Sequence, residues 1–165
     1  MHTNRQNINA DFTCKNCGCY VSACSALSGV VHRNHCPYCL HSRHVDLFRA
    51  GDRLCACKSL MAPVGLTLKR SWDKYAAQRG GEVMLVHRCT GCGELAINRI
   101  AADDDLALIL AILEDGSGEQ QKIQRQCHAK GIRLINPTER LQILTRLLGD
   151  TGCKTYQHDL NYQVI

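Results

Sequence analysis

Three pairs of cysteines in this chain have the two-residue spacing that lets both thiolates bind one metal ion. They are Cys14 with Cys17, Cys36 with Cys39, and Cys89 with Cys92. Two such pairs from distant parts of a chain complete the tetrahedral four-ligand site that Zn²⁺ prefers. A closed site of this kind is structural, because it leaves no position for a water nucleophile. The spacing therefore predicts a domain organised by zinc.

A glycine directly follows the first and the third pair, at Gly18 and Gly93. Glycine adopts the positive φ that a tight turn needs, and the backbone N–H groups of such a turn can point at the sulfur atoms. The sequence thus predicts two zinc knuckles of the same form.

The central pair has a second interpretation. The segment Cys36-Pro37-Tyr38-Cys39 is also the active-site form of thiol-disulfide oxidoreductases, whose first cysteine has a lowered pKa at a helix N-terminus. Such enzymes carry one pair inside a βαβ unit, whereas this chain has three pairs and no long helix is predicted after Cys39. We favour zinc binding and keep dithiol catalysis as an alternative. Four further cysteines lack ligand spacing: Cys19, Cys24, Cys127 and Cys153.

Composition and the N-terminal sequence indicate a reducing compartment. The chain has 165 residues and 12 cysteines, and the segment Met1–Ala10 is polar, without the apolar core of a signal peptide. We therefore expect reduced thiols and a cytoplasmic or similarly reducing location. The longest apolar run, Leu106–Leu113, is far shorter than the roughly 20 residues that span a bilayer, so no membrane association is expected.

Positive charge is concentrated in the first part of the chain. Residues 1–100 contain 13 Lys and Arg against 6 Asp and Glu, whereas residues 101–165 contain 7 against 9. Binding of two Zn²⁺ by seven thiolates would reduce the formal charge of the first part from +7 to +4. That balance fits a surface that contacts phosphate, although many proteins of this charge bind no nucleic acid.

The pattern of residues predicts a small α+β fold. Strands are expected at 64–69, 82–87 and 95–100, and the last two lie directly before and after the third cysteine pair. This arrangement is typical of a zinc-ribbon or treble-clef domain of short antiparallel strands. Helices are expected at 104–113, 119–130 and 137–148, the last with Asn136 as N-cap and ending at Gly149.

The helix predicted at 137–148 has a broad apolar face, formed by Leu141, Ile143, Leu144, Leu147 and Leu148. That face must pack on something, either the helix at 104–113, another protein or a second copy of the chain. Residues 150–165 show no readable motif.

The residues around the central pair resemble the RNHCP-domain family, whose name stands here as Arg33-Asn34-His35-Cys36-Pro37. Further matches are the segments 12–18, 38–46, 51–53, 87–93 and 98–104, together with His32 and with Cys57, Met61 and Pro63. The resemblance covers residues 12–113 and implies a zinc-binding domain. The chain departs from the family pattern around 72–79 and beyond 114. We expect a polar segment at 1–11, the domain at 12–113, a helical extension at 114–149 and a tail at 150–165.

The resemblance also suggests how the metal ligands are completed. The family pattern adds Cys57 as a seventh thiolate, and the eighth ligand is expected from His35, His44, His87, His32 or Cys55. We predict one site of Cys14, Cys17, Cys36 and Cys39 and a second of Cys57, Cys89, Cys92 and His44. A crossed pairing, in which the two glycine-bearing knuckles share a metal, stays open.

The expected function is that of a structural zinc protein, not an enzyme, that binds RNA as a ribosome or ribonucleoprotein component. Five arginines recur beside the predicted ligands and suit bidentate contact with phosphate: Arg33, Arg43, Arg53, Arg88 and Arg99. Their alternative role is ion pairing with Asp46, Asp52 or the cluster Asp103–Asp105. A protein-interaction scaffold that uses the C-terminal helices is the close rival.

Two enzyme classes are weaker alternatives. A treble-clef nuclease of the His-Asn-His type would take a base and a metal ligand from His32, Asn34, His35 and Asp46, but the usual spread of its residues is missing. A zinc deaminase is disfavoured, because the proline lies inside the cysteine pair and not before it.

Overall fold

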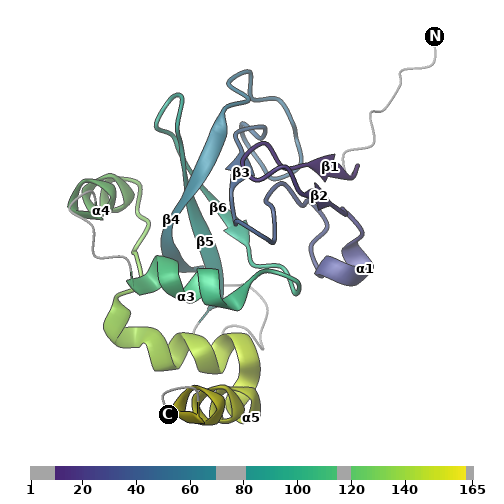
Figure 1. The fold of residues 1–165 in the computed structure, drawn as a ribbon. Helices are drawn as coiled ribbons and strands as arrows, with labels where there is room; N and C mark the ends of the chain where they lie inside the picture. The colour runs from purple at the N-terminus through teal and green to yellow at the C-terminus, as the bar shows by residue number, and fades with distance from the viewer. Residues whose placement is uncertain (1–9, 70–80, 115–119, 163–165) are drawn as a thin grey trace. The chain divides into compact units, whose positions relative to one another are not determined.

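The computed structural model describes residues 10–69, 81–114 and 120–162 (Figure 1). Residues 1–9 of the predicted polar segment and the segment at 72–79 that departs from the family pattern lie outside these ranges. The chain divides into two compact units, one of residues 1–65 and 85–112 and the other of residues 66–84 and 113–165. No helix among the described residues is long and apolar enough to cross a membrane.

The first unit begins with a small antiparallel ladder. Strand β1 (Phe12–Thr13) pairs with β2 (Tyr20–Val21), and the first knuckle forms the turn between them. The short helix α1 (Ser25–Ser28) follows and ends at Gly29, where φ is 70°. The ladder thus holds the first cysteine pair on a two-stranded support.

The larger sheet has four strands in the order β3-β4-β5-β6. Their bounds are β3 Ser42–Arg43, β4 Leu60–Lys69, β5 Glu82–Cys89 and β6 Leu95–Arg99. Strand β3 pairs antiparallel with β4, with Ser42 opposite Met61. The strands predicted at 64–69, 82–87 and 95–100 are all present. β4 starts four residues earlier and β5 ends two residues later than predicted, whereas β6 ends one residue earlier.

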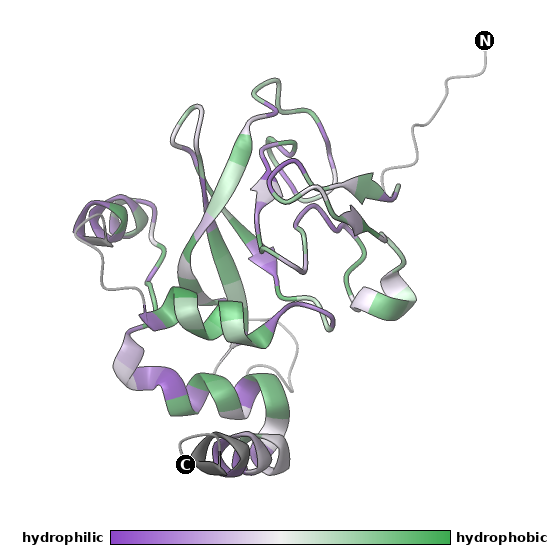
Figure 2. Cartoon of the chain, viewed as in Figure 1, coloured by the Kyte–Doolittle hydropathy of each residue, from purple (hydrophilic) through white to green (hydrophobic). Residues whose placement is uncertain are grey.

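Burial along these strands explains their sequence. Five consecutive residues of β5, from Val83 to His87, are buried, so this strand is apolar without alternation. Figure 2 shows the hydrophobic colouring along β5. The core of the first unit includes Leu40, Met61 and Leu85, each at most 1% exposed. The observed architecture is therefore the predicted small α+β fold of zinc-ribbon type.

Helix α3 (Leu106–Glu114) begins two residues later than predicted. Asp105 precedes it, and its Oδ1 accepts hydrogen bonds from the N–H groups of Ala107 and Leu108 at 2.9 and 3.2 Å. Asp105 is thus the N-cap residue, whereas the sequence placed the start of the helix at Asp104. The reason is that Asp103 and Asp104 are engaged elsewhere, as described below.

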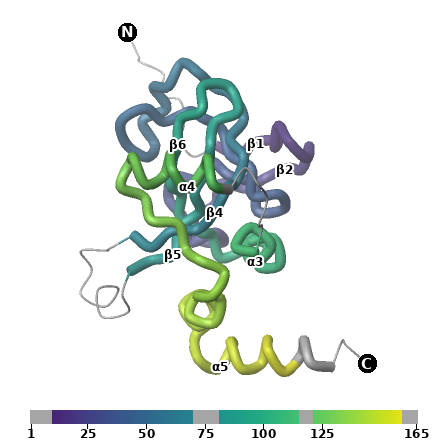
Figure 3. Tube along the Cα trace, turned by 90° about the vertical axis from the view of Figure 1, so that its left-hand side faces the viewer, coloured from purple at the N-terminus to yellow at the C-terminus, as the bar shows by residue number. Residues whose placement is uncertain are grey.

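The second unit contains α4 (Gln120–Ala129), the 3₁₀ turn Pro137–Glu139 and α5 (Arg140–Tyr162). Asn136 caps the turn, with its side chain accepting from the N–H of Thr138, and Glu139 completes a capping box. At Gly149, where φ is 73° and ψ is 172°, α5 is interrupted, so it consists of two helical stretches (Figures 1 and 3). The second stretch lies in residues 150–162, for which the sequence predicted no helix.

Residues 66–84 group with the second compact unit, although they lie within the range 12–113 that resembles the RNHCP domain. The N–H of Ile135 donates to the carbonyl of Leu66 at 2.8 Å, and Thr67 forms a β-bridge with Leu134. Arg146 donates to the carbonyl of Gly81 at 3.1 Å. These hydrogen bonds hold the end of β4 and the start of β5 to the segments beyond residue 130. β4 and β5 consequently contribute to both units.

Candidate metal centres

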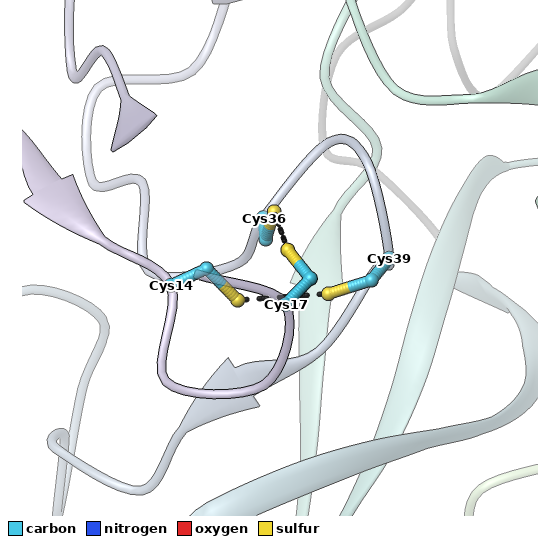
Figure 4. A group of neighbouring side chains, drawn as sticks. All are labelled: Cys14, Cys17, Cys36 and Cys39. Carbon is cyan, nitrogen blue, oxygen red and sulfur yellow. Dashed lines mark hydrogen bonds between the residues drawn. The ribbon is translucent and has the colours of Figure 1, made fainter. Parts of the chain in front are cut away.

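Four cysteine sulfurs from two knuckles converge in the first unit (Figure 4). The Sγ atoms of Cys14, Cys17, Cys36 and Cys39 all lie within 4.8 Å of one another, and we call this group the thiolate cluster. Cys14 Sγ lies 3.6 Å from Cys39 Sγ, and Cys17 Sγ lies 3.6 Å from Cys36 Sγ. Thiolates bound to one tetrahedral zinc lie about 3.8 Å apart. The cluster therefore has the dimensions of a zinc site.

A second group of four ligands, which we call the mixed cluster, consists of His44, Cys57, Cys89 and Cys92. Its ligand atoms also lie within 4.8 Å of one another. Cys57 Sγ is 3.6 Å from Cys89 Sγ, and Cys92 Sγ is 3.3 Å from Nδ1 of His44. A sulfur and an imidazole nitrogen on one tetrahedral zinc are separated by about 3.5 Å. This cluster too can hold a metal ion.

The cysteine knuckles share one pattern of backbone hydrogen bonds. In the first, the N–H of Gly18 donates to the carbonyl of Cys14 at 3.0 Å, and in the third the N–H of Gly93 donates to Cys89 at the same distance. Both glycines have a φ of 76°. The central knuckle has the equivalent bond from Leu40 to Cys36 at 2.8 Å, with a φ of 57° at the leucine. All three pairs are therefore turns of the same type, although only two have the glycine that identifies them in the sequence.

The mixed cluster receives its histidine through a turn without a Cys-x-x-Cys spacing. The N–H of His44 donates to the carbonyl of Ser59 at 2.9 Å, and the N–H of Lys58 donates back to the carbonyl of His44 at 3.1 Å. Lys58 has a φ of 53°. These bonds continue the pairing of β3 with β4 and place His44 next to Cys57. The ligand pair is thus formed across two strands.

Ionisation of the thiols differs within each cluster. A backbone hydrogen bond at Cys19 lowers the pKa of Cys17 to about 6, and the Ser59 hydroxyl, as the largest cause, lowers the pKa of Cys57 to about 6. Burial raises the pKa of Cys36 above the ordinary value of a thiol. Cys17 and Cys57, one in each cluster, are thus thiols that lose a proton more readily than an ordinary cysteine. A bound cation would ionise the others.

The structure brings together the same two sets of four residues that we predicted from the sequence. It does not cross the pairs, since the two glycine-bearing knuckles lie in different clusters. His35 and Cys55, which were candidates for the eighth ligand, are buried outside both clusters. The described cysteines are all free thiols. Each cluster has four ligands and can hold one metal ion.

The comparison with known families agrees with this geometry. The RNHCP domain matches residues 9–110, which is more than half of the chain. The chain belongs to the RNHCP-domain family. No curated protein and no solved structure matches it. The matched range contains all eight residues of the two clusters and ends within α3, three residues before the boundary predicted at 113.

The first and third residues of the RNHCP motif are structural in this chain. Arg33 and His35 are only 2% and 1% exposed. His35 Nε2 lies 2.8 Å from Oδ2 of Asp104, whose side chain is fully buried, and the Arg33 guanidinium donates to the same carboxylate at 3.3 Å. The other carboxylate partner of Arg33 is Asp103, at 2.8 Å. We had grouped Arg33 with the phosphate-binding arginines. That expectation is wrong, because its charge is enclosed and paired.

The second residue of the motif, Asn34, fixes a loop. Its Nδ2 donates to Oδ2 of Asp46 at 3.4 Å. Asp46 also accepts hydrogen bonds from the N–H groups of Gly51 and Arg53 at 3.0 and 3.1 Å. The carboxylate therefore closes the loop between β3 and β4, which carries Cys57 at its end. These contacts occupy both Asn34 and Asp46.

A buried histidine connects the central knuckle with the sheet. His87 is 0% exposed; its Nε2 lies 2.6 Å from the carbonyl of Leu40, and its Nδ1 lies 2.9 Å from Nδ2 of Asn98. The Asn98 amide must donate, so Nδ1 accepts and Nε2 carries the proton. Burial lowers the pKa of His87 to about 3, which keeps the ring neutral. Its ring also lies 6.2 Å from that of His35.

Three of the predicted arginines meet at one pocket of about 240 Å³, which Arg33, Arg43 and Arg53 line together with Asp11 and Asn34. Arg43 is half-buried and donates to the carbonyl of Lys58 at 3.3 Å, and Arg53 lies 3.5 Å from Asp46. Arg33 and Arg53 are thus each paired with a carboxylate, whereas Arg43 has no carboxylate partner among the described residues. Arg88 and Arg99 do not line it.

Proposed function

We propose that this RNHCP-domain protein is a structural zinc protein without enzymatic activity that binds RNA as part of a ribonucleoprotein such as the ribosome. One observation carries the non-enzymatic part. Each cluster supplies four ligands of its own, so a tetrahedral Zn²⁺ there would have no open position for a water or a substrate. Zinc is the metal that best suits a set of four thiolates and a set of three thiolates with one imidazole.

The residues of the nuclease alternative do not fit catalysis. His35 is 1% exposed and held by Asp104, and Asn34 and Asp46 bind each other within a loop. A general base must reach the proton that it abstracts. His35 is thus buried, and Asn34 and Asp46 are half-buried and paired, so these three side chains hold the fold together, and only His32 of the four candidates is exposed.

The oxidoreductase alternative also lacks support. The first cysteine of such a pair needs a lowered pKa and access to a disulfide. Cys36 is 0% exposed, and its burial raises its pKa. Its Sγ lies 3.6 Å from Sγ of Cys17, which belongs to the other knuckle of the cluster. The central pair is better suited to metal binding.

RNA binding is supported by charge and by the arginine pocket. The formal charge of the chain is +5, and two Zn²⁺ on seven thiolates would leave it at +2. Arg43 and Arg53 face one pocket beside the first knuckle, where guanidinium groups on a rigid support can take up phosphate. The protein-interaction alternative rests on exposed apolar side chains, such as Phe48 at 81% and Leu141 at 56%.

The test is crosslinking of the full-length protein to RNA in cells, followed by purification and sequencing of the bound RNA. We expect RNA to crosslink and the complex to weaken steeply with salt. The matched variant Arg43→Gln with Arg53→Gln should recover less RNA. A protein that carries two zinc ions and binds a protein partner but no RNA would contradict the proposal and favour the scaffold.

A further inference from the structure

The first unit, which carries both clusters, has almost no net positive charge once each cluster holds a zinc ion. Residues 1–65 and 85–112 contain nine Lys and Arg against seven Asp and Glu, a formal charge of +2. Seven thiolates and two Zn²⁺ change this by −3, to −1. Residues 66–84 and 113–165 contain eleven basic against eight acidic residues, a charge of +3 that metal binding does not alter. The surplus of positive charge therefore lies in the second unit.

Within the second unit, α4 is basic along its whole length. Lys122, Arg125 and Lys130 lie in or directly after the helix, and no acidic residue occurs from Gln120 to Thr138. Lys122 and Arg125 are exposed, and neither forms an ion pair within the part of the chain that the structure describes. Their charge is thus available to an external anion.

The side chains of α4 are sorted onto two faces. Cys127 is fully buried and Ile123 is half-buried, so this side of the helix packs against the protein. The other side bears Gln121, Gln124, Arg125, His128 and Ala129, which occur at spacings of three and four residues and line an open hollow of about 580 Å³. In Figure 2 the hydrophilic colouring covers most of this helix. The outer face is polar and cationic, and the described residues that line the hollow all belong to α4.

We propose that this outer face of α4 binds the sugar-phosphate surface of double-stranded RNA. The proposal rests on the RNA-binding function proposed above and gives it a location outside the RNHCP domain. Arg125 and Lys122 would contact phosphate oxygens. The amides of Gln121 and Gln124 both donate and accept, which suits the 2′-hydroxyls that line the wide minor groove of an RNA duplex. The small side chain of Ala129 leaves room for the backbone of the duplex to approach.

The chemistry of the face favours a duplex over a single strand and over a protein. Unpaired bases are bound mainly by stacking on planar side chains, and α4 has no Phe, Tyr or Trp, so only His128 and Arg125 could serve in this way. A protein partner would need a desolvated apolar patch, whereas the lining consists of two amides, a guanidinium, an imidazole and one methyl group.

The experiment measures binding of the full-length, zinc-loaded chain to a fluorescein-labelled RNA hairpin by anisotropy, from about 50 to about 200 mM KCl. We expect the variant Lys122→Glu with Arg125→Glu to bind at least roughly tenfold more weakly. The slope of log affinity against log salt should fall by about 2, because two phosphate contacts are lost. The matched control is Lys154→Glu, an exposed lysine on α5, which should change affinity by less than about twofold.

The outcomes of this experiment distinguish the assignment to α4 from the RNA-binding function. Unchanged zinc content and melting temperature show that the variants are folded. If Lys122→Glu with Arg125→Glu does not fold, the milder variant Lys122→Gln with Arg125→Gln takes its place. Hairpin binding that is equally strong in wild type and α4 variant overturns the assignment to α4 but leaves RNA binding intact. Absence of hairpin binding by the wild type, with binding of single-stranded RNA retained, overturns the choice of a duplex, whereas absence of binding to both RNAs contradicts the RNA-binding function itself. Equal affinity for a DNA hairpin of the same sequence, or for single-stranded RNA, overturns the choice of an RNA duplex.

Discussion

His35 and Asp104 are 69 residues apart in the chain, and yet His35 Nε2 lies 2.8 Å from Asp104 Oδ2, with both side chains closed to water. The same carboxylate accepts a hydrogen bond from the N–H of Ala101 at 2.8 Å and faces the Arg33 guanidinium. One buried carboxylate thus ties the central knuckle to the segment that leads into α3. This pairing explains the structural use of the RNHCP motif residues.

Loss of Asp104 should destabilise the zinc unit strongly. Asp104→Ala leaves the buried guanidinium of Arg33 without one partner, and removing one member of a buried ion pair costs about 3–5 kcal/mol. The free energy of unfolding, measured by urea denaturation of the zinc-loaded protein, should fall by that amount. The control is Asp103→Ala, which removes the other partner of Arg33. Its side chain is 43% exposed, so its loss should be smaller, and equal losses in the two variants would contradict this account.

Metal analysis of the purified protein should give two zinc ions per chain. Cys17→Ser should remove the ion of the thiolate cluster and Cys92→Ser that of the mixed cluster, leaving one ion in each variant, because each cluster has only four ligands. Cys24→Ser replaces an exposed cysteine outside both clusters and should retain two ions. Mass spectrometry of the metal content checks all three. Two ions in Cys17→Ser would show that the pairing of ligands is different.

Stability should decrease in mild acid because of His87. Burial lowers its pKa to about 3, so the folded protein keeps the ring neutral while the unfolded chain takes up a proton near pH 6.5. The contribution of His87 to stability is therefore present above about pH 6.5 and is lost as the pH falls from there towards 3, by up to about 1.4 kcal/mol per pH unit.

The measurement for His87 compares wild type and His87→Gln by denaturation at about pH 7.0 and about pH 5.5, on either side of the ordinary histidine pKa. Protonation of the metal ligands changes the free energy of unfolding with pH equally in both proteins. The difference between the two pH dependences therefore gives the contribution of His87. The wild type should lose more stability than the variant over this range. Parallel slopes would show that the ring is protonated in the folded state.

Asp52 should control the order of the loop that presents Phe48. Its carboxylate accepts hydrogen bonds from four backbone N–H groups, those of Leu47, Phe48, Arg49 and Leu54, at 2.8 to 3.1 Å. Desolvation opposes ionisation, but these bonds together hold the pKa of Asp52 well below its usual range. The stabilisation is present above about pH 4 and is lost only as the pH falls through the lower folded pKa.

Hydrogen exchange of those four amides tests the assignment. Asp52→Ala should speed their exchange at least roughly tenfold and leave the zinc content unchanged, since none of the four residues is a ligand. Asp150→Ala, at an exposed aspartate of the second unit, is the control and should leave these amides protected. Protection that survives in Asp52→Ala would mean that the loop is ordered by other contacts.

Several features of this protein were predicted correctly because they depend on residues that are close together in the sequence. The spacing of the cysteine pairs identified the knuckles, because two thiolates at this separation can reach one metal from a single tight turn. The N-cap at Asn136 and the interruption at Gly149 were also correct, since capping and positive φ depend on a few neighbouring residues. The strand β5 was also predicted, because a run of apolar residues can be recognised from a few neighbouring positions of the sequence.

Contacts between residues that are distant in the chain could not be predicted from the sequence. Arg33 was predicted to face phosphate, but it is enclosed with Asp103 and Asp104, and no local pattern states which of several acidic residues an arginine meets. The helix at 150–162 was not predicted, and neither was the hydrogen bond from Ile135 to Leu66, because both depend on how distant parts of the chain pack.

The sequence by itself determined that the chain has metal-binding knuckles, short strands between them and helices after them, because each of these is set by residues within one turn of the chain. The tertiary structure decided which knuckles share a site, that His44 and not His35 joins Cys57, and that the side chains of Arg33 and His35 are internal. Those choices depend on which strands pair and which charges are buried together, and these are properties of the folded chain.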